Sequence, residues 1–280
     1  NELEYDEHDC IIRRELSSSG RSRAFINDTP VSVSLLKELG TLLIDIHSQH
    51  QSLLVGKPEY QTEILDAFCG MGFEIFEGPE IDTDYYCFQA LNIPQDHPAR
   101  DMQDTFFLPN GNVLRTQTSA VQVRAMEKNG VPIKMFTVGQ CYRKELDATH
   151  SAMFGQIEGL YIDTIEKGVN LSDMLATMRT FASKYFEKDD LELRIRPSYF
   201  PFTDPSIEVD MKWKNDKWLE LMGAGMVHPN VLRSCGVNPD EYQGFAFGFG
   251  WDRLAMLKYN LPDLRDLYNN DVRWLKSAGF

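Results

Sequence analysis

Several features that mark other protein classes are missing from this sequence, and each absence excludes a class of function. No apolar run approaches the length of a membrane span, and the first residues show no signal-peptide pattern. The 5 cysteines are scattered, odd in number and not in CxxC pairs, which argues against a disulfide framework or a zinc site and indicates reduced thiols in the cytoplasm. Basic residues are scarce, with 28 Lys and Arg against 42 Asp and Glu. A general nucleic-acid coat is therefore excluded, because phosphate neutralisation needs Lys and Arg.

A phosphate-binding loop of the GxxxxGK[ST] type is also absent, which excludes nucleotide binding by that device. What is present is enough apolar sequence, 42%, for a substantial core in 280 residues, as one large domain or two small ones. The chain begins with Asn1 in the middle of a pattern, and we interpret it as a fragment at its N-terminus.

Residues 1–69 show the short alternating elements of a small mixed α/β unit. The pattern predicts two strands around a Ser-Gly turn, a helix capped by Ser32 or Ser34, a buried strand and a second helix; the ranges are 9–16, 21–27, 35–39, 42–46 and 58–68. His47 and His50 lack a third metal ligand nearby, so we interpret them as surface or loop histidines.

This first segment resembles the RecN family of DNA-repair ATPases over three sequence words, IIRRELSSSGRSRAFINDTPVS, LLKELGTLLIDIHSQHQSLL and YQTEILDAF. The resemblance implies an interior piece of an ATPase head spanning residues 1–69, with HSQHQ as a glutamine loop near the nucleotide. Because the phosphate-binding loop, the coiled-coil arm and the signature motif are missing, neither ATPase activity nor DNA binding is expected from residues 1–69 alone.

The stretch from Gly139 to Asp163 carries the densest set of polar residues between two strand-like runs. On the second run Gln156, Glu158 and Leu160 share one face, and Ile157, Gly159 and Tyr161 the other. A polar face of a hairpin is commonly a solvated face, and that interpretation stays open at this point. The alternative is a site, since Arg143 and Glu145 also share a face and could hold an anion beside carboxylates and an amide.

Other segments predict the framework around this hairpin. Residues 84–104 are polar and predict an extended segment over a sheet, in which His97, Arg100 and Asp101 are either catalytic or hold the loop in place by ion pairs. Ser119 is a predicted N-cap of a helix over 120–129. A Met and aromatic stripe predicts an amphipathic core helix over 171–186.

Two further stretches suggest ligand contacts. Phe200 and Phe202 flank a proline, and they form either a hydrophobic bulge at a sheet edge or an aromatic wall for an apolar ligand. A glycine-studded strand over 244–250 runs into a helix that carries Arg253 in its first turns. A cation at a helix N-terminus is unfavourable unless an anion is bound, so Arg253 is interpreted as a phosphate ligand.

Residues 71–280 resemble the catalytic domain of the α subunit of bacterial phenylalanyl-tRNA synthetase, a class II aminoacyl-tRNA synthetase. The motifs that carry the resemblance, in order, are GFEIFEGPEI, NIPQDHPARDMQDTF, LRTQTSAVQVR, YRKELDATHSAMFGQIEG, RPSYFPFTDPS, WLELMGAGMVHPNVL and GFAFGFGWDRLAMLKY. The fold that this implies is α+β: an antiparallel sheet flanked by helices, here over 70–280, preceded by the small α/β fragment. We expect a fusion or an assembly chimera near residues 69–72.

The resemblance also implies roles for single residues. Arg143 would bind the ATP α-phosphate, Phe154 would stack on adenine, and Arg253 would bind the γ-phosphate. The substrate amino and carboxylate groups, the ring and a magnesium ion would be held by a larger set: Gln117, Ser119, Glu145, Gln156 and Glu158 for the polar groups, Phe200, Phe202 and Ala246 for the ring, and Asp204 for the metal. Gln117 stands where many members have histidine, and Asp204 stands where glutamate is usual.

The activity implied is ATP-dependent activation of L-phenylalanine and its transfer to tRNA(Phe), with Mg²⁺. The partners implied are a separate β subunit, in an α2β2 heterotetramer, and tRNA(Phe); a cytoplasmic location follows, without membrane association. A non-catalytic binding module with the synthetase fold and an inactive chimera carrying a repair fragment are the alternatives.

Overall fold

The computed structural model describes residues 12–16, 22–27, 29–32, 35, 58–100, 105–144, 152–212 and 217–259. The chain divides into two units, residues 1–51 and 52–280, and each is described by itself. In the part of the chain so described, no helix has the length and apolar character needed to span a membrane.

The first unit contains an antiparallel sheet in the order β1-β2-β3. Its strands are β1 (Ile12–Leu16), β2 (Ser22–Ile26) and β3 (Thr29–Val31), so the predicted hairpin is confirmed. Ser32 Oγ accepts a hydrogen bond from the backbone N–H of Leu35 at 3.1 Å, as a helix cap would. The predicted helix beyond Leu35, the strand over 42–46 and the histidine-rich turn lie outside the described residues.

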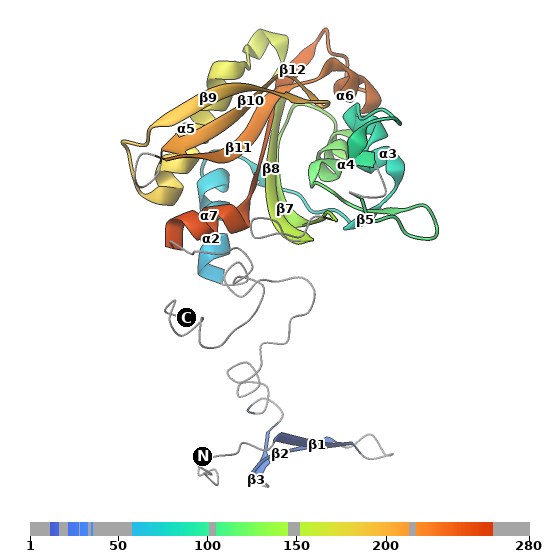
Figure 1. Ribbon diagram of the computed structural model, residues 1–280, viewed down its shortest axis with the longest axis vertical. Helices are drawn as coiled ribbons and strands as arrows, with labels where there is room; N and C mark the ends of the chain where they lie inside the picture. The colour runs from blue at the N-terminus through green and yellow to red at the C-terminus, as the bar shows by residue number, and fades with distance from the viewer. Residues whose placement is uncertain are drawn as a thin grey trace. The chain divides into compact units, whose positions relative to one another are not determined.

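The second unit is built on a seven-stranded sheet in the order β4-β7-β8-β12-β11-β10-β9 (Figure 1). All neighbours are antiparallel except β4 and β7, which are parallel. The strands are β4 (Glu74–Ile75), β7 (Ile133–Tyr142), β8 (Met153–Thr164), β9 (Leu193–Phe200), β10 (Thr203–Lys212), β11 (Trp218–Val227) and β12 (Tyr242–Gly250). A separate pair, β5 (Ile81–Asp82) and β6 (Val113–Leu114), lies near the start of the unit.

Helices cover both faces of this sheet. One hydrophobic cluster involves α2 (Pro58–Cys69), α5 (Leu171–Phe186) and α7 (Trp251–Tyr259). A second involves α3 (Asp84–Cys87), α4 (Ser119–Asn129) and α6 (Pro229–Ser234). Adjacent residues of β7, Met135 and Phe136, belong to different clusters. Because neighbouring side chains of a strand point to opposite faces, the two clusters lie on opposite sides of the sheet.

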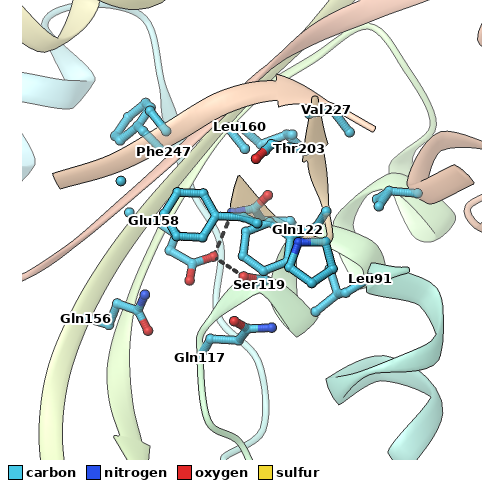
Figure 2. Close-up of a pocket in the computed structure, with 18 of the residues that line it drawn as sticks. Leu91, Gln117, Ser119, Gln122, Gln156, Glu158, Leu160, Thr203, Val227 and Phe247 are labelled. Atoms are coloured by element: carbon cyan, nitrogen blue, oxygen red, sulfur yellow. Dashed lines mark hydrogen bonds between the residues drawn. The ribbon is translucent and has the colours of Figure 1, made fainter. Parts of the chain in front are cut away.

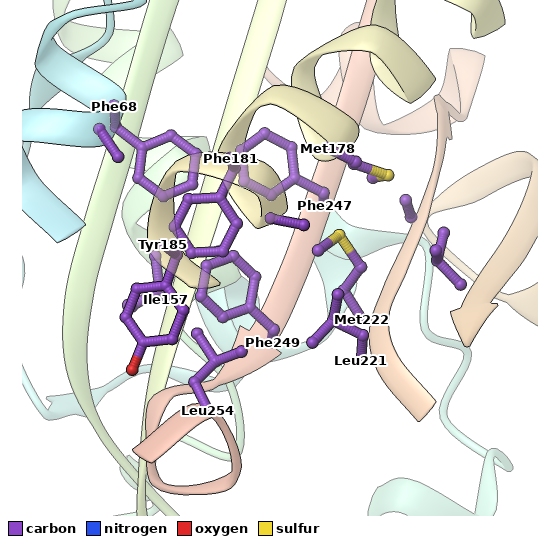
Figure 3. Close-up of a cluster of buried hydrophobic side chains, with 14 of the residues drawn as sticks. Phe68, Ile157, Met178, Phe181, Tyr185, Leu221, Met222, Phe247, Phe249 and Leu254 are labelled. Carbon is purple, nitrogen blue, oxygen red and sulfur yellow. The ribbon is translucent and has the colours of Figure 1, made fainter. Parts of the chain in front are cut away.

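Helix α2 packs in the first of these clusters. The ring of Phe68 is fully buried, with its centroid 4.7 Å from that of Phe181 and 5.5 Å from that of Phe247 (Figure 3). Ile64 and Ala67 on the same helix are buried beside it. Ile64, Ala67 and Phe68, which the sequence predicted to belong to the N-terminal segment, are therefore part of the core of the second unit.

Helix α5 has the predicted bounds, and its predicted stripe is confirmed by the burial of Met174, Met178, Phe181 and Tyr185. Asn170 caps it: the Asn170 side chain accepts from the backbone N–H of Ser172 at 2.8 Å, and Asp173 accepts from that of Asn170 at 2.9 Å.

The prediction of an extended segment over residues 84–104 was wrong in its first part. The chain there forms α3 and two short 3₁₀ helices, η1 (Gln89–Leu91) and η2 (Pro98–Arg100). Cys87, Phe88, Ala90, Leu91 and Ile93 are buried in the second cluster, so tertiary packing of these few apolar residues stabilises short helical turns in a polar sequence. Arg100 donates to Asp84 and to the carbonyl oxygen of Ile93, which agrees with the loop-holding interpretation.

Candidate active site

A cavity of about 360 Å³ lies on the α4 side of the sheet. Strand β8 supplies Gln156, Glu158 and Leu160 to its lining, while Ile157 points to the opposite core. The period-2 assignment of this strand is therefore confirmed, and its polar face lines a cavity. The cavity has a polar end near Glu158, an apolar end between helices and strands, and a third part near Arg143.

Glu158 forms the polar end with two residues of α4. Ser119 Oγ donates to Glu158 Oε2 at 2.6 Å, and Gln122 Nε2 donates to the same oxygen at 2.8 Å (Figure 2). Ser119 is the first residue of α4 and not its cap: Thr118 holds the cap position, and its side chain makes no cap hydrogen bond. The capping role predicted for Ser119 was therefore wrong, and its hydroxyl serves the carboxylate.

Burial changes the acidity of this carboxylate. Glu158 is only 4% exposed, and this loss of solvation raises the pKa of its carboxyl group to about 7. The hydrogen bond from Ser119 acts in the opposite direction and lowers the pKa. A cation placed beside Glu158 would favour the ionised form. The polar end is therefore suited to bind an ammonium group.

Gln156 and Gln117 line the same part of the cavity. The Gln156 carbonyl oxygen, Oε1, accepts a hydrogen bond from the buried Cys141 thiol at 3.2 Å. This bond turns one end of the Gln156 amide toward β7, so its amide nitrogen is the end left to donate. An amide nitrogen next to a carboxylate can bind the two ends of an amino acid, its carboxylate and its ammonium.

The apolar end is lined by two parallel rings, one from the last residue of β9 and one from the turn that leads to β10. The centroids of Phe200 and Phe202 are 5.8 Å apart with an interplanar angle of 8°. The remaining apolar lining comes from elements on both sides of the cavity: Leu91, Ile93, Val123, Met126, Leu160, Val227, Val231 and Ala246. This surface is suited to a planar apolar group.

Arg143 and Phe154 line the third part of the cavity. The Arg143 guanidinium carbon lies 5.0 Å from the ring centroid of Phe154, and Arg143 Nε donates to the carbonyl oxygen of Thr116 at 3.2 Å. One guanidinium edge is thus fixed by the backbone. The pair offers a cation and a flat ring side by side, which suits a phosphate joined to a planar base.

Arg253 lies on α7, just beyond Gly250, and its side chain is exposed and is not among the cavity-lining residues. Asp252 precedes it in the first turn and is 2% exposed. A carboxylate at that position offsets the helix dipole, so the dipole alone does not require a bound anion at Arg253.

Asp204 is exposed and also lies outside the cavity lining. The pairing of β10 shifts register between Thr203 and Ser206, both of which are buried. The irregularity turns Asp204 and Pro205 to solvent. Glu145 lies outside the described residues. The other predicted residues that the structure brings together around one cavity are Gln117, Ser119, Arg143, Phe154, Gln156, Glu158, Phe200, Phe202 and Ala246.

Several cavity residues were not predicted as site residues, and four of them have titratable or amide side chains. Gln122 lies one helical turn after Ser119, and the three-residue spacing on a helix could have revealed it. Glu208 and Glu220 line the cavity from β10 and β11, and their alternation with apolar residues was the available signal. His97, which the sequence left between catalysis and loop positioning, is also in the lining.

The chain was compared with protein-family models, with curated proteins and with solved structures. The family model described as tRNA synthetases class II core domain (F) matches residues 44–278. The "Phenylalanine--tRNA ligase alpha subunit" of Neisseria meningitidis serogroup B is 53% identical over 270 residues, covering 96% of this chain and 81% of that protein. The protein of the same name from Coxiella burnetii is 56% identical over 266 residues, covering 94% of this chain and 80% of that protein.

Among solved structures, the pyrrolysyl-tRNA synthetase from Desulfitobacterium hafniense is similar with a TM-score of 0.60. It is 21% identical, and the match covers 85% of this chain and 81% of that one. At this identity the likeness shows the fold alone, and it agrees with the predicted antiparallel sheet flanked by helices.

Proposed function

The chain belongs to the class II tRNA synthetase core-domain family, and from this premise we propose that it is the catalytic part of a phenylalanine–tRNA ligase α subunit. It activates L-phenylalanine with ATP to the aminoacyl adenylate and transfers the amino acid to tRNA(Phe). The relatives that carry this name are 53% and 56% identical to the chain.

The single observation that carries the proposal is the arrangement of one buried carboxylate and two parallel rings in the same cavity. Glu158 takes the substrate ammonium, and Phe200 and Phe202 pack against the substrate ring. Ala246 limits the depth of the ring pocket. A tyrosine hydroxyl entering this apolar end would lose its bonds to water, which costs about 1–3 kcal/mol when no partner replaces them.

The remaining polar residues surround the reacting carboxylate. Gln156 presents its amide nitrogen, and Ser119 and Gln117 complete the polar end. Glu145 stays a predicted contact of the same group. Since Gln117 replaces a histidine common in the family, it keeps a hydrogen bond and supplies no charge.

The nucleotide occupies the part of the cavity near Arg143. Phe154 stacks on the adenine, and Arg143 binds the α-phosphate. Arg253, on α7, binds the γ-phosphate. Arg253 lies outside the cavity lining, so this role requires ATP to extend past Gly250 toward α7.

The chemistry needs no side-chain nucleophile. A carboxylate oxygen of phenylalanine forms a bond to the α-phosphorus, the bond from that phosphorus to the β-phosphate oxygen breaks, and pyrophosphate leaves with the electron pair. Arg143 stabilises the negative charge that develops on the α-phosphate. Glu158 and the aromatic rings hold the amino acid in line, which lowers the barrier by positioning.

Magnesium is implied by the family, and the carboxylates of this chain are a partial fit to it. Within the described residues there is no cluster of three or more potential metal ligands. Mg²⁺ in nucleotide sites commonly uses one or two carboxylates together with substrate phosphates. Glu208 and Glu220 line the cavity and meet that pattern, and the Glu208 carboxylate is also bonded to Arg196 at 2.7 Å and to Ser198 at 2.9 Å. Asp204 is exposed and would need ligands from a second chain. Bound there, the ion would neutralise phosphate charge.

A β subunit and tRNA(Phe) are the proposed partners, in an α2β2 assembly. The direct test is aminoacylation of a tRNA(Phe) transcript by the chain purified with a phenylalanine–tRNA ligase β subunit. Phenylalanine attached to tRNA(Phe), and not to a tRNA for another amino acid, is the expected result. Binding of ATP and phenylalanine without any charging would instead indicate a non-catalytic binding module.

A further inference from the structure

Arg115 is a buried arginine at the end of β6 that is not part of the cavity lining. Only 3% of the residue is exposed. Its Nε donates to the carbonyl oxygen of Gln140 at 2.8 Å. Its Nη1 donates to the carbonyl oxygens of Gly78 at 3.1 Å and Pro79 at 3.2 Å. In the parts of the chain that the structure describes, these backbone oxygens are its hydrogen-bond partners.

A guanidinium keeps its charge at all ordinary pH values, so burying it is unfavourable unless its donors are satisfied. Here the planar fork bonds two segments that are far apart in sequence, residues 78–79 and the last residues of β7. Gly139 makes room for it, because a Cβ at Gly139 would overlap the Arg115 Nη2 atom. The space beside Gly139 and the three carbonyl oxygens therefore fit the planar fork of an arginine.

The same two segments are joined again through the backbone of Arg115 and through Tyr142. The N–H of Arg115 donates to the carbonyl oxygen of Glu80 at 2.9 Å, and its carbonyl oxygen accepts from the N–H of Tyr142 at 2.9 Å. The Tyr142 hydroxyl donates to Glu80 Oε2 at 2.6 Å. Burial and this bond both raise the Tyr142 pKa, so the hydroxyl remains a donor.

Arg143 follows immediately on this network. Its Nε donates to the carbonyl oxygen of Thr116, the residue after Arg115. Arg115 thus fixes the two pieces of backbone that hold Arg143. One is the end of β7, which Arg115 bonds at Gln140 and Tyr142 and which leads directly into Arg143. The other is Thr116, which follows Arg115 and accepts the bond from Arg143 Nε.

We propose that Arg115 is a positioning residue that sets the place of Arg143 at the phosphate end of the site. It does so by bonding residues 78–79 to the end of β7 and acts without touching substrate. This inference rests on the proposed function, because it assigns Arg143 to ATP. Arg115 should therefore affect the binding and reaction of ATP. It should leave phenylalanine binding unchanged, because that end of the cavity is held by α4 and β8.

The test compares Arg115→Lys with Arg124→Lys, in the chain purified with a β subunit. Lysine at 115 keeps the positive charge, which also acts on Glu158, but its single ammonium lacks the planar fork whose Nε and Nη1 atoms bond the two segments separately. Arg124 is a matched control, since it bonds the nearby Asp82 at 2.6 and 2.8 Å. Within the described residues, none of its hydrogen bonds is to Arg115, Tyr142 or Arg143.

Three quantities separate positioning from loss of folding: the melting temperature, the Kd of L-phenylalanine measured by calorimetry without ATP, and the KM for ATP with kcat in pyrophosphate exchange. For Arg115→Lys we expect kcat/KM for ATP to fall about tenfold or more while the phenylalanine Kd changes less than about twofold. Arg124→Lys should change neither. Equal losses in both substrates, or normal ATP kinetics, would overturn the proposal.

A second variant covers the case in which Arg115→Lys does not fold. Tyr142→Phe removes the bond to Glu80 from the same network, and a smaller loss of kcat/KM for ATP, about threefold, is expected at unchanged phenylalanine Kd. If the wild-type complex shows no exchange with phenylalanine, the proposed function fails, and the Kd of ATP then decides the role of Arg115: a weaker Kd in Arg115→Lys supports it and an unchanged one contradicts it.

Discussion

Ser119 and Glu158 are joined by a 2.6 Å hydrogen bond across the interface between α4 and β8, in the buried part of the cavity. The bond ties the first turn of a helix to the strand that carries the polar lining. Loss of solvation is the largest influence on the pKa of Glu158, and it favours the neutral acid. The hydrogen bond from Ser119 acts in the opposite direction and favours the ionised carboxylate. The acid–base state of Glu158 is therefore a measurable property of the site.

The pH dependence of stability follows from this raised pKa. The folded pKa of Glu158 is about 7 against 4.5 for an ordinary glutamate, so the folded state binds a proton more tightly than the unfolded state. The contribution of Glu158 to stability is present below pH 4.5 and is lost as the pH rises through 7, by about 3 kcal/mol in total. Compared with Glu158→Gln, the melting temperature of the wild type should fall as the pH is raised from 5 to 8, and a parallel course of the two proteins would contradict the assignment.

Phenylalanine affinity should have the opposite dependence on pH. The ammonium binds the ionised carboxylate, so the Kd should weaken about tenfold per pH unit below the pKa of Glu158 and level off above it. Calorimetry of L-phenylalanine binding between pH 5.5 and 8 measures this directly. Glu158→Gln should bind weakly at every pH; a wild-type Kd that does not change with pH would show that Glu158 is not the ammonium partner.

Ser119→Ala should weaken phenylalanine binding about tenfold at pH 7, because it leaves a buried carboxylate with one hydrogen bond fewer. The same loss should move the midpoint of the pH profile upward. Thr177→Ala is the control, since it removes a hydroxyl that donates to the Asp173 carbonyl oxygen at 2.9 Å on α5, away from the cavity. An unshifted midpoint in Ser119→Ala would argue that the hydroxyl has only a packing role.

Ala246 offers a matched pair of variants at the apolar end. Ala246→Val adds two methyl groups at the wall of the cavity, where the phenylalanine ring is proposed to bind. The KM for phenylalanine should rise about tenfold or more, since overpacking an apolar site costs about 1–3 kcal/mol. Ala246→Gly should accept phenylalanine analogues with an added ring substituent that the wild type rejects. The KM values for L-phenylalanine and a ring-substituted analogue test both variants. If Val is tolerated, the ring does not reach Ala246.

Asp252 fixes the start of β8, where Phe154 and Gln156 project. Its Oδ2 accepts a 2.7 Å hydrogen bond from the N–H of Gly155, and a side chain at Gly155 would overlap the ring of Trp251. Asp252→Ala should lower stability by about 1–3 kcal/mol by leaving that N–H unbonded, and should raise the KM for ATP through Phe154.

The matched control for Asp252 is at the other end of the same strand. Asp163 Oδ1 accepts from the N–H of Thr164 at 2.8 Å, and its Oδ2 accepts from the Tyr161 hydroxyl at 3.1 Å. Asp163→Ala therefore also leaves a backbone N–H of this strand without its carboxylate partner, at a residue outside the cavity lining. It should leave the KM for ATP unchanged. An equal rise of the KM for ATP in the two variants would contradict a specific effect of Asp252 on Phe154.

The sequence alone predicted the parts of the site that depend on local periodicity. The alternation of β8 placed Gln156 and Glu158 on one face and Ile157 on the other, since a strand has a period of two. The amphipathic stripe gave α5 its bounds. The family resemblance then brought together residues distant in sequence, such as Arg143 and Ala246, which periodicity cannot relate.

What the sequence could not show depends on tertiary packing. Asp204 faces solvent because of a local register shift in β10, and a single sequence does not reveal where a strand pair is irregular. The helical turns around Leu91 are stabilised by burial against α4 and α6, in a segment whose composition is polar. The bond of Ser119 to Glu158 and the place of Arg115 both require the fold.

Residues 1–69 are the part where sequence and structure divide the chain differently. The RecN-like assignment and the junction near residue 70 stay predictions, while Phe68 packs in the core of the second unit and the family match begins at residue 44. Sequencing the source DNA across codons 60–80 tests the fusion. Two separate genes there would contradict a genuine fusion.

Arg143→Ala should abolish activation while leaving phenylalanine binding nearly intact. The arginine is assigned to the α-phosphate, and losing such a charge contact in the transition state reduces the rate by about a hundredfold or more. Exchange kinetics together with the phenylalanine Kd measure the two effects separately. Near-normal exchange would refute the role assigned to Arg143.

The measurement that tests the central claim most directly is amino-acid-dependent exchange of pyrophosphate into ATP by the chain with a β subunit present. Each of the twenty amino acids is supplied in turn at neutral pH with Mg²⁺. The account predicts exchange with L-phenylalanine, much weaker exchange with tyrosine, and none with charged amino acids. Absence of exchange with phenylalanine in a folded complex that binds ATP, or equal exchange with an unrelated amino acid, would contradict it.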